Sequence, residues 1–361
     1  MNATSPPRSS EVRATSIPAA WHRAGRVMAA SQGAAEEGWG GVVMGDPCIV
    51  RDDEAGLWRM FLFALPPGHA HAVCEGDPAD PAAWHLLGPL EFTNPQVLGD
   101  EAAFKPFVVS QAHSPGEPAL IGGRYALLIG TNHRAKVIRR AWSPSLGGPW
   151  TLEGQVLIDR GRYEDFDARH VDAVSGYFFP ERNELLYFYM GYPSCAQPYR
   201  LSAFGSAQAA AAELLGGDGV RKLGPVLPPS SRPGHWASGW VGGLQLLPGR
   251  EHRWIGVANA SPTPPDPADT GLAAEEPPPS LGGFAWCDEP WPIKGWQWND
   301  EPIERIESIP AGAADGGEGV NLWRHFALPL GDDRLALFYN SGDYFQEKLF
   351  LKLAGPSPPV R

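Results

Sequence analysis

The chain has 361 residues, of which 43 are glycine, 38 are proline and 14 are tryptophan. Its 29 basic and 41 acidic residues give a net charge of −12, which argues against binding to nucleic acid or to an anionic membrane surface. Because disordered chains are poor in aromatic residues, the many glycines and prolines are expected in the turns of a folded protein.

The two ends of the sequence differ in composition from the rest. Residues 1–19 are rich in Ser, Pro and Ala and are predicted to form a flexible tail, as are residues 355–361. No secretory signal is recognised near Met1, and no apolar run approaches the roughly 18 residues of a membrane-spanning helix. The widely spaced cysteines suggest reduced thiols, so a cytoplasmic protein is expected; they are Cys48, Cys74, Cys195 and Cys287.

Between these tails the sequence is typical of short β-strands. Segments rich in aromatic and branched residues alternate with turns that contain Gly, Pro, Asp or Asn. Residues 207–215 are the exception, because their alanine-rich composition, followed by two glycines, predicts a helix. Residues 261–283 contain many prolines and are predicted to form a long surface loop.

The predicted strands are organised by an internal repeat of five copies. Each copy begins with a polar motif and continues with three apolar strands, often followed by Trp. This pattern predicts an all-β protein with one five-bladed β-propeller domain over residues 20–354. The blades are expected to start near residues 46, 115, 172, 238 and 325. A β-sandwich is the alternative, but it does not require a fivefold recurrence.

In a propeller the first strand of each blade lines the central channel, so the beginnings of these strands meet at one end of the axis. Carboxylates and histidines recur at the predicted blade starts and are therefore expected to lie close together. They are Asp46, Glu117, Asp172, His113, His170, His235 and His325.

Three motifs resemble the five-bladed propeller glycosidases, which include glycoside hydrolase families 43, 32, 68, 62 and 130. Residues 45–49 (Gly-Asp-Pro-Cys-Ile) are similar to the Asp-Pro motif of the first strand in that superfamily. Residues 142–150, which end in Gly-Pro-Trp, resemble a strand end common in that superfamily, and residues 123–127 (Gly-Arg-Tyr-Ala-Leu) resemble a pattern of its second blade. The resemblance extends over most of residues 40–354 as a repeated pattern of strands and turns in each blade.

This resemblance implies a glycosidase-like enzyme that acts on a glycoside or small polyol-like substrate through carboxylates and needs no cofactor. Asp46 would be the general base or nucleophile, Glu117 would raise the pKa of the acid or stabilise the transition state, and Asp172 would be the acid. The superfamily usually has Asp in the second blade and Glu in the third, so the sequence departs from it at both positions. Nearby alternatives for the acid are Glu164, Asp165 and Asp167.

Other residues near the predicted blade starts are candidates for substrate binding. Sugar faces stack on aromatic rings, which suggests four tryptophans, although packing between blades is an alternative for each. The candidates are Trp39, Trp236, Trp240, Trp323, His113, His170, His325 and Arg169. Arg169 would also supply the cation required by a phosphorylase of the family-130 type.

Two further hypotheses remain open. The first is a metal-dependent oxygenase or lyase in which His113, His170, His235 and His325 hold one divalent ion of iron, zinc, manganese or calcium. The second is a propeller that binds carbohydrate without catalysis. In each case a small molecule or an oligosaccharide is the expected partner, and the sequence does not indicate its linkage.

Overall fold

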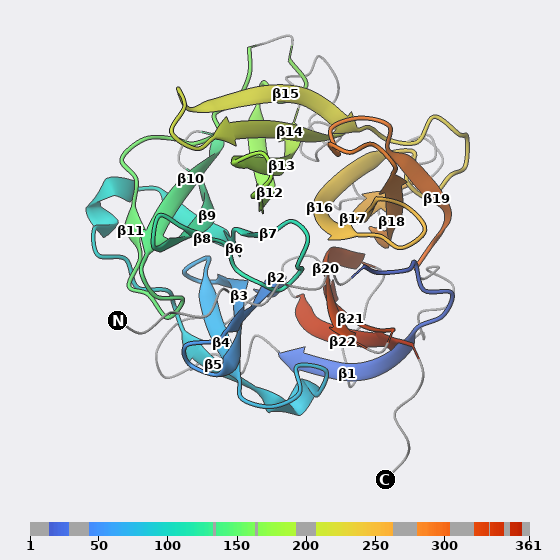
Figure 1. Ribbon diagram of the computed structural model, residues 1–361, viewed down its shortest axis with the longest axis horizontal. Coiled ribbons are helices and arrows are strands. Elements are labelled where there is room, and N and C mark those ends of the chain that lie inside the picture. The colour runs from blue at the N-terminus through green and yellow to red at the C-terminus, as the bar shows by residue number, and fades with distance from the viewer. Residues whose placement is uncertain are drawn as a thin grey trace, which may run out of the picture.

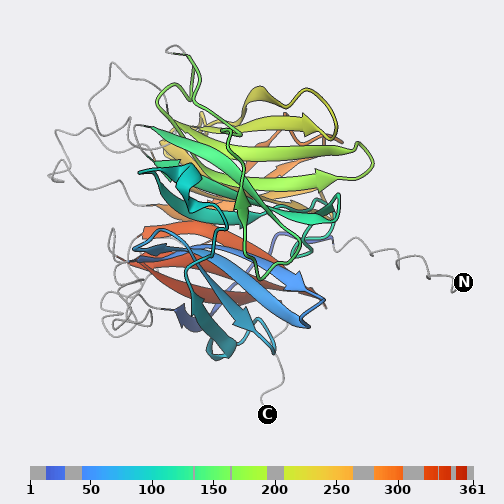
Figure 2. The same ribbon diagram turned by 90° about the vertical axis from the view of Figure 1, so that its left-hand side faces the viewer.

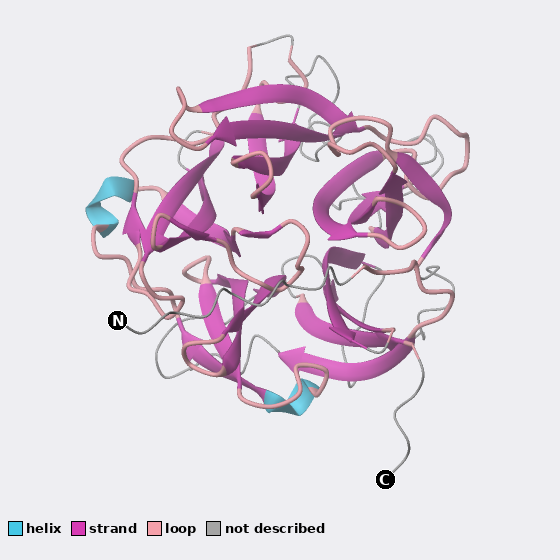
Figure 3. Ribbon diagram, viewed as in Figure 1, coloured by secondary structure: helices cyan, strands magenta, loops and turns pink. Residues whose placement is uncertain are grey.

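Five sheets surround a central axis, as Figure 1 shows, so the predicted all-β, five-bladed propeller is confirmed. The described elements are strands, apart from the short 3₁₀ turns η2 (Pro81–Ala83) and η3 (Pro95–Leu98) (Figure 3). Within the described part of the chain, no helix is long and apolar enough to cross a membrane. The computed structural model describes residues 14–28, 43–132, 135–162, 165–192, 207–262, 280–303, 321–331, 333–342 and 347–355.

The first three blades follow one another along the chain, and each is given from its inner to its outer strand. Blade 1 contains β2 (Val43–Asp52), β3 (Leu57–Leu65), β4 (Ala70–Cys74) and β5 (Trp84–Gly88). Blade 2 contains β6 (Ala102–Val108), β9 (Arg124–Asn132), β10 (Lys136–Ser143) and β11 (Thr151–Leu152), with β8 (Leu120–Ile121) beside β9. Blade 3 contains β12 (His170–Phe179), β13 (Glu184–Tyr192), β14 (Ala207–Leu214) and β15 (Val220–Leu227), with β7 (Ser110–Gln111) parallel to β12.

The last two blades complete the ring. Blade 4 contains β16 (Trp240–Pro248), β17 (Trp254–Ser261), β18 (Leu281–Cys287) and β19 (Gln297–Pro302). Blade 5 contains β20 (Asn321–Gly331), β21 (Arg334–Gly342) and β22 (Lys348–Ala354), and its outer strand is β1 (His22–Met28). The first described strand of the chain therefore pairs with the last one and closes the ring, a feature that the sequence analysis did not predict.

The inner strands carry few polar residues because each is covered by neighbouring blades. All nine residues of β16 are buried, as are nine of the ten residues of β2. Large rings fill the spaces around them; Trp150, Trp254 and Tyr187 are among the largest fully buried side chains. In Figure 1, which looks down the axis, β12 is seen nearly end-on whereas β14 and β15 lie across the view, so the inner strand of blade 3 runs roughly along the axis; Figure 2 gives the side view. Residues near the beginnings of the inner strands therefore gather at one end of the axis.

The helix predicted over residues 207–215 is wrong, because these residues form the strand β14. Three of its alanines lie opposite Tyr187, Phe188 and Tyr189 of β13, and all three are completely buried. Small side chains fit beside these rings within the packed interior. The high helix propensity of alanine is overridden here by the packing of the blade.

Two predicted boundaries are also corrected. The described part of the predicted N-terminal tail contacts blade 4, because the Thr15 N–H donates to the Pro248 carbonyl at 2.8 Å. In the predicted loop over residues 261–283, the last three residues already belong to β18, while residues 263–279 lie outside the described part.

Blade 2 begins earlier than residue 115, since its inner strand is β6. Residues 109–119 follow β6 and lie across the axis near the far ends of the inner strands (Figure 1). There the Ala112 N–H donates to the Phe178 carbonyl at 3.0 Å, and the Arg51 N–H donates to the Gly116 carbonyl at 2.6 Å.

Candidate functional site

The five inner strands share a β-bulge close to their beginnings. The pairing register shifts just after Gly45, Phe104, Asp172, Val241 and Trp323. A bulge turns a side chain away from the regular alternation of the strand and is often found beside functional sites. In four of the strands a residue other than glycine has a left-handed backbone there, with φ of 51° at Asp46, 53° at Lys105, 55° at Ala173 and 40° at Arg324. Such strain persists only where the surrounding structure enforces it.

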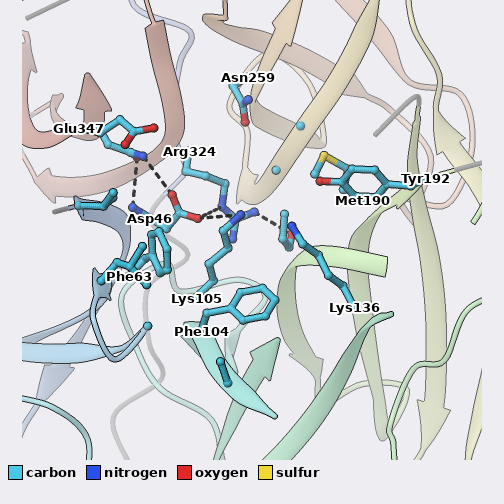
Figure 4. Close-up of a pocket in the computed structure, with 18 of the residues that line it drawn as sticks. Asp46, Phe63, Phe104, Lys105, Lys136, Met190, Tyr192, Asn259, Arg324 and Glu347 are labelled. Atoms are coloured by element: carbon cyan, nitrogen blue, oxygen red, sulfur yellow. Dashed lines mark hydrogen bonds and ion pairs between the residues drawn. The ribbon is translucent and has the colours of Figure 1, made fainter. Parts of the chain in front are cut away.

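These bulges surround an axial cavity of about 340 Å³. Its lining includes three cationic side chains, the carboxylates of Asp46 and Glu347, and two asparagines (Figure 4). The cations are Lys105, Lys136 and Arg324, and the rings in the lining are Phe63, Phe104, Tyr192 and Trp240. The cavity therefore combines apolar surface with a few convergent charged groups, as small-molecule sites do.

Asp46 is held in one orientation by Asn340 of the neighbouring blade. The Asp46 N–H donates to Asn340 Oδ1 at 3.1 Å, and Asn340 Nδ2 donates to Asp46 Oδ1 at 3.1 Å. Gly45 makes this approach possible, because a Cβ at that position would overlap the Asn340 side chain. The other carboxylate oxygen, Oδ2, lies 3.6 Å from Lys105 Nζ and 3.6 Å from Arg324 Nε.

Asp172 shares Lys105 with Asp46 and is completely buried. Its Oδ2 is 2.7 Å from Lys136 Nζ and 3.3 Å from Lys105 Nζ, and its Oδ1 accepts the Ala173 N–H at 2.7 Å. Burial alone would raise the pKa of Asp172, but the two lysines outweigh it and hold that pKa well below its ordinary range. A carboxyl group with so low a pKa is a poor proton donor, so Asp172 is better suited to orient the two lysines than to act as the acid.

Lys105 is the fourth residue of the inner strand of blade 2, as Asp46 is in blade 1. Burial would lower its pKa, but Asp172 and Asp46 outweigh this effect and raise it. Glu117 is not part of the cavity, because it belongs to the segment at the far end of the axis, where its backbone carbonyl accepts the Gln111 N–H at 2.8 Å. The expectation that Glu117 joins Asp46 and Asp172 is wrong, since it depended on a blade start near residue 115.

The structure separates the four blade-start histidines, so their expected convergence is also wrong. Within the described ranges, no three His, Cys, Asp or Glu residues are grouped closely enough to hold a metal ion. His113 lies 3.2 Å from Glu181 and packs on Trp254. His170 accepts the Lys136 N–H at 3.1 Å, and His325 stacks on Tyr339. His235 Nε2 lies 3.1 Å from the Asn299 carbonyl, with which it can form a hydrogen bond.

The other candidates are dispersed. Trp240 lines the axial cavity, whereas Trp236 lines a separate hollow of about 480 Å³ with His235. Asp167 is buried and pairs with Lys222 at 2.6 Å, and Asp165 accepts the Arg162 N–H. Arg169 is half-buried and donates its backbone N–H to the Tyr192 carbonyl. Trp39, Glu164 and the side chain of Trp323 lie outside the described part of the chain.

Buried neutral histidines predict a loss of stability in acid. Burial lowers the pKa of His69 to about 4 and that of His325 to about 3, from 6.5. Because the unfolded chain binds these protons first, the free energy of unfolding should fall as the pH drops from about 6.5 towards 4. The two groups together should contribute several kcal/mol to this loss, and urea unfolding at successive pH values measures it. His325→Gln should make the dependence shallower by about one proton. Parallel curves for wild type and His325→Gln would refute the assignment.

No family model matches the sequence, and no curated protein matches it. Solved structures do match over nearly the whole chain. A thermostable family-43 glycoside hydrolase has 14% identity and a TM-score of 0.58, covering 88% of this chain and 96% of that one. An endo-arabinase from Bacteroides thetaiotaomicron has 13% identity and a TM-score of 0.55, covering 96% and 99%.

A third structure is from the GH130 family of mannoside phosphorylases, which contains glycoside hydrolases that target β-1,2-mannosidic linkages in Candida mannan. It has 12% identity and a TM-score of 0.56, and covers 98% of this chain and 94% of that one. Identities this low establish the architecture, not the reaction. The chain thus shares its fold with the five-bladed β-propeller glycoside hydrolases that its first-strand motif resembles.

Proposed function

We propose that the protein is a glycosidase-like enzyme that acts on a glycoside or small polyol-like substrate in the axial cavity, with Asp46 as its essential carboxylate. The observation that carries this proposal is the clamp on Asp46. A strained bulge and a hydrogen bond from the Asp46 N–H to Asn340 Oδ1 fix the backbone, and Asn340 Nδ2 donates to the carboxylate, which lies beside a cavity lined by aromatic rings. A carboxylate held in this way presents its oxygen to a bound substrate in a single geometry, which is what a reacting group requires.

Cleavage of a glycosidic bond requires one carboxylate to activate water or to attack the anomeric carbon, and a second group to protonate the leaving oxygen. In the proposed reaction Asp46 has the first role. Glu347 has the second, because it is the other carboxylate in the lining and its backbone carbonyl accepts the N–H of Met44, two residues before Asp46, at 3.1 Å. Asp172 positions Lys105 and Lys136, and this chemistry needs no cofactor.

The cavity size favours a small ligand. Its volume of about 340 Å³ lies near the lower end of the range of small-molecule sites. Phe63, Phe104, Tyr192 and Trp240 offer rings against which the apolar face of a sugar can pack. A single sugar unit or a short glycoside is therefore the proposed substrate.

The test is a panel of aryl and alkyl glycosides assayed with the wild type and with Glu347→Gln. We expect turnover of at least one aryl glycoside by the wild type. Glu347→Gln should lower kcat about 100-fold for alkyl glycosides but much less for nitrophenyl glycosides, whose leaving group needs little protonation. Glu181→Gln, at the far end of the axis, is the matched control.

Equal losses on both substrate classes would contradict the role of Glu347. If no glycoside is cleaved but sugars bind, the protein is a carbohydrate-binding propeller and the catalytic proposal fails.

A further inference from the structure

We infer that the ligand of the axial cavity carries an anionic group, a carboxylate or a phosphate, which binds to Lys105, Lys136 and Arg324. The inference rests on the proposed function for the sugar part of the ligand and adds the charge class of that ligand. It is carried by the arrangement of charges at the bulges, which the resemblance to glycosidases did not predict.

The cationic side chains are more accessible in this cluster than the carboxylates they contact. The side chains of Lys105, Lys136 and Arg324 are 20%, 29% and 14% exposed, compared with 4% for Asp46 and 0% for Asp172. Figure 4 shows the charged ends of Lys105 and Arg324 beside Asp46 and that of Lys136 beyond them, next to Asp172. A ligand that reaches this side of the cavity therefore meets N–H donors first.

The backbone fixes these cations in place. Lys105 and Arg324 both have left-handed φ angles, which residues other than glycine rarely adopt. Arg324 Nη1 donates to the Ala173 carbonyl at 2.7 Å, and a Cβ at Gly243 would overlap the same guanidinium. Blade 4 thus has glycine at its bulge, where the other blades have a side chain, and this leaves room for Arg324.

Lys136 is positioned by rings as well as by charge. Its Nζ lies 5.5 Å from the centre of the Phe104 ring and 5.6 Å from that of Tyr192, in addition to its 2.7 Å contact with Asp172. An ammonium group held near rings at the edge of a cavity lies in a partly dry environment, where hydrogen bonds to an anion are stronger than in water.

The charges are also separated within the cavity. In Figure 4, Asp46 lies between Glu347 on one side and Lys136 on the other. An anionic group would bind beside Lys136, where the Arg324 side chain reaches from blade 5 to the Ala173 carbonyl of blade 3, and the glycosidic bond would lie towards Glu347. This cationic side is unexpected in a chain of net charge −12, so it does not reflect the average composition. Lysine and arginine both bind carboxylates and phosphates, so the contacts define the charge of the ligand and not its source.

The test is calorimetric titration of the whole protein with glucose, galactose and mannose, with the uronate and the 6-phosphate of each, and with inorganic phosphate. At least one anionic sugar should bind about tenfold more tightly than its neutral counterpart, and the advantage should shrink at high salt. Preference for the uronate or for the phosphate identifies the source of the anion. Equal affinity for neutral and anionic sugars, or no binding of any probe, would overturn the inference.

Lys136→Met should remove most of the anion preference, which is the ratio of the affinity for the anionic sugar to the affinity for its neutral counterpart. Lys136→Arg should retain it, and Lys294→Met, an equal charge change on an exposed turn, should have no effect. Thermal unfolding shows whether Lys136→Met folds; the salt dependence of the wild type decides the question if it does not.

The two proposals fail separately. Anion-dependent binding without turnover of any glycoside would overturn the proposed reaction alone. Turnover with the same KM for neutral and anionic glycosides, unaffected by Lys136→Met, would overturn the anion site alone.

Discussion

Asp46→Asn should lower kcat/KM for a cleaved glycoside about 1,000-fold and leave the fold intact. The amide is nearly the same size as the carboxylate but can neither accept a proton nor attack an anomeric carbon. Asn340 can still bond to the remaining oxygen, so sugar binding should persist. Steady-state kinetics, together with calorimetric titration of the substrate, measure both effects.

Asp53→Asn is the matched control, because Asp53 lies in the same blade and its side chain is 92% exposed. It should change kcat/KM by less than about twofold. Wild-type activity in Asp46→Asn would show that Asp46 is not catalytic, and a loss of binding together with activity would assign it to substrate recognition instead.

Asp172→Asn should lower the free energy of unfolding by about 3–5 kcal/mol, since it leaves two partly buried lysines without their shared counter-ion. The low pKa of the native carboxyl has a second consequence. Because Asp172 releases its proton more readily in the folded state, its contribution is complete above the ordinary carboxyl range and is lost as the pH falls through that range and below. Asp172→Asn should therefore have a smaller effect at pH 3 than at pH 7.

Urea unfolding at the two pH values measures this contribution. Asp53→Asn should cost less than about 1 kcal/mol, as expected for an exposed ion pair. Adding Lys136→Met to Asp172→Asn should restore part of the loss, because it removes one of the stranded charges. If Asp172→Asn lowers the free energy of unfolding by less than 1 kcal/mol at pH 7, the charges of the two lysines are compensated by groups other than Asp172.

The repeat of strands and turns that defines the blades could be predicted from the sequence, because strand length, turn residues and apolar runs are local properties. Residues 207–214 were misassigned because alanine favours a helix when its neighbours are unknown, and the rings of β13 that select a strand lie elsewhere in the chain. β6 was missed because its central residues, Lys105 and Pro106, are unusual in an inner strand. The first blade was recognised because Asp46 lies in a motif.

The candidate site was only partly predictable for a related reason. Lys105 and Arg324 occupy the fourth residue of their inner strands, as Asp46 does, so their common position was a usable signal. It could be used only after β6 had been located. Lys136, Asn340 and Glu347 come from outer parts of their blades, and nothing local in the sequence indicates that they line the axis.

The closure of the ring through β1 bears on how the protein forms during synthesis. β1 leaves the ribosome before every other described strand, but its partner β22 is made after all of them. Until then blade 5 is incomplete. Asp46 also lacks its hydrogen bonds to Asn340, which lies 294 residues further along the chain. Domains generally fold as they emerge, but this cavity cannot be assembled from a partial chain. A truncated or stalled product would therefore contain much of the scaffold and have no functional site.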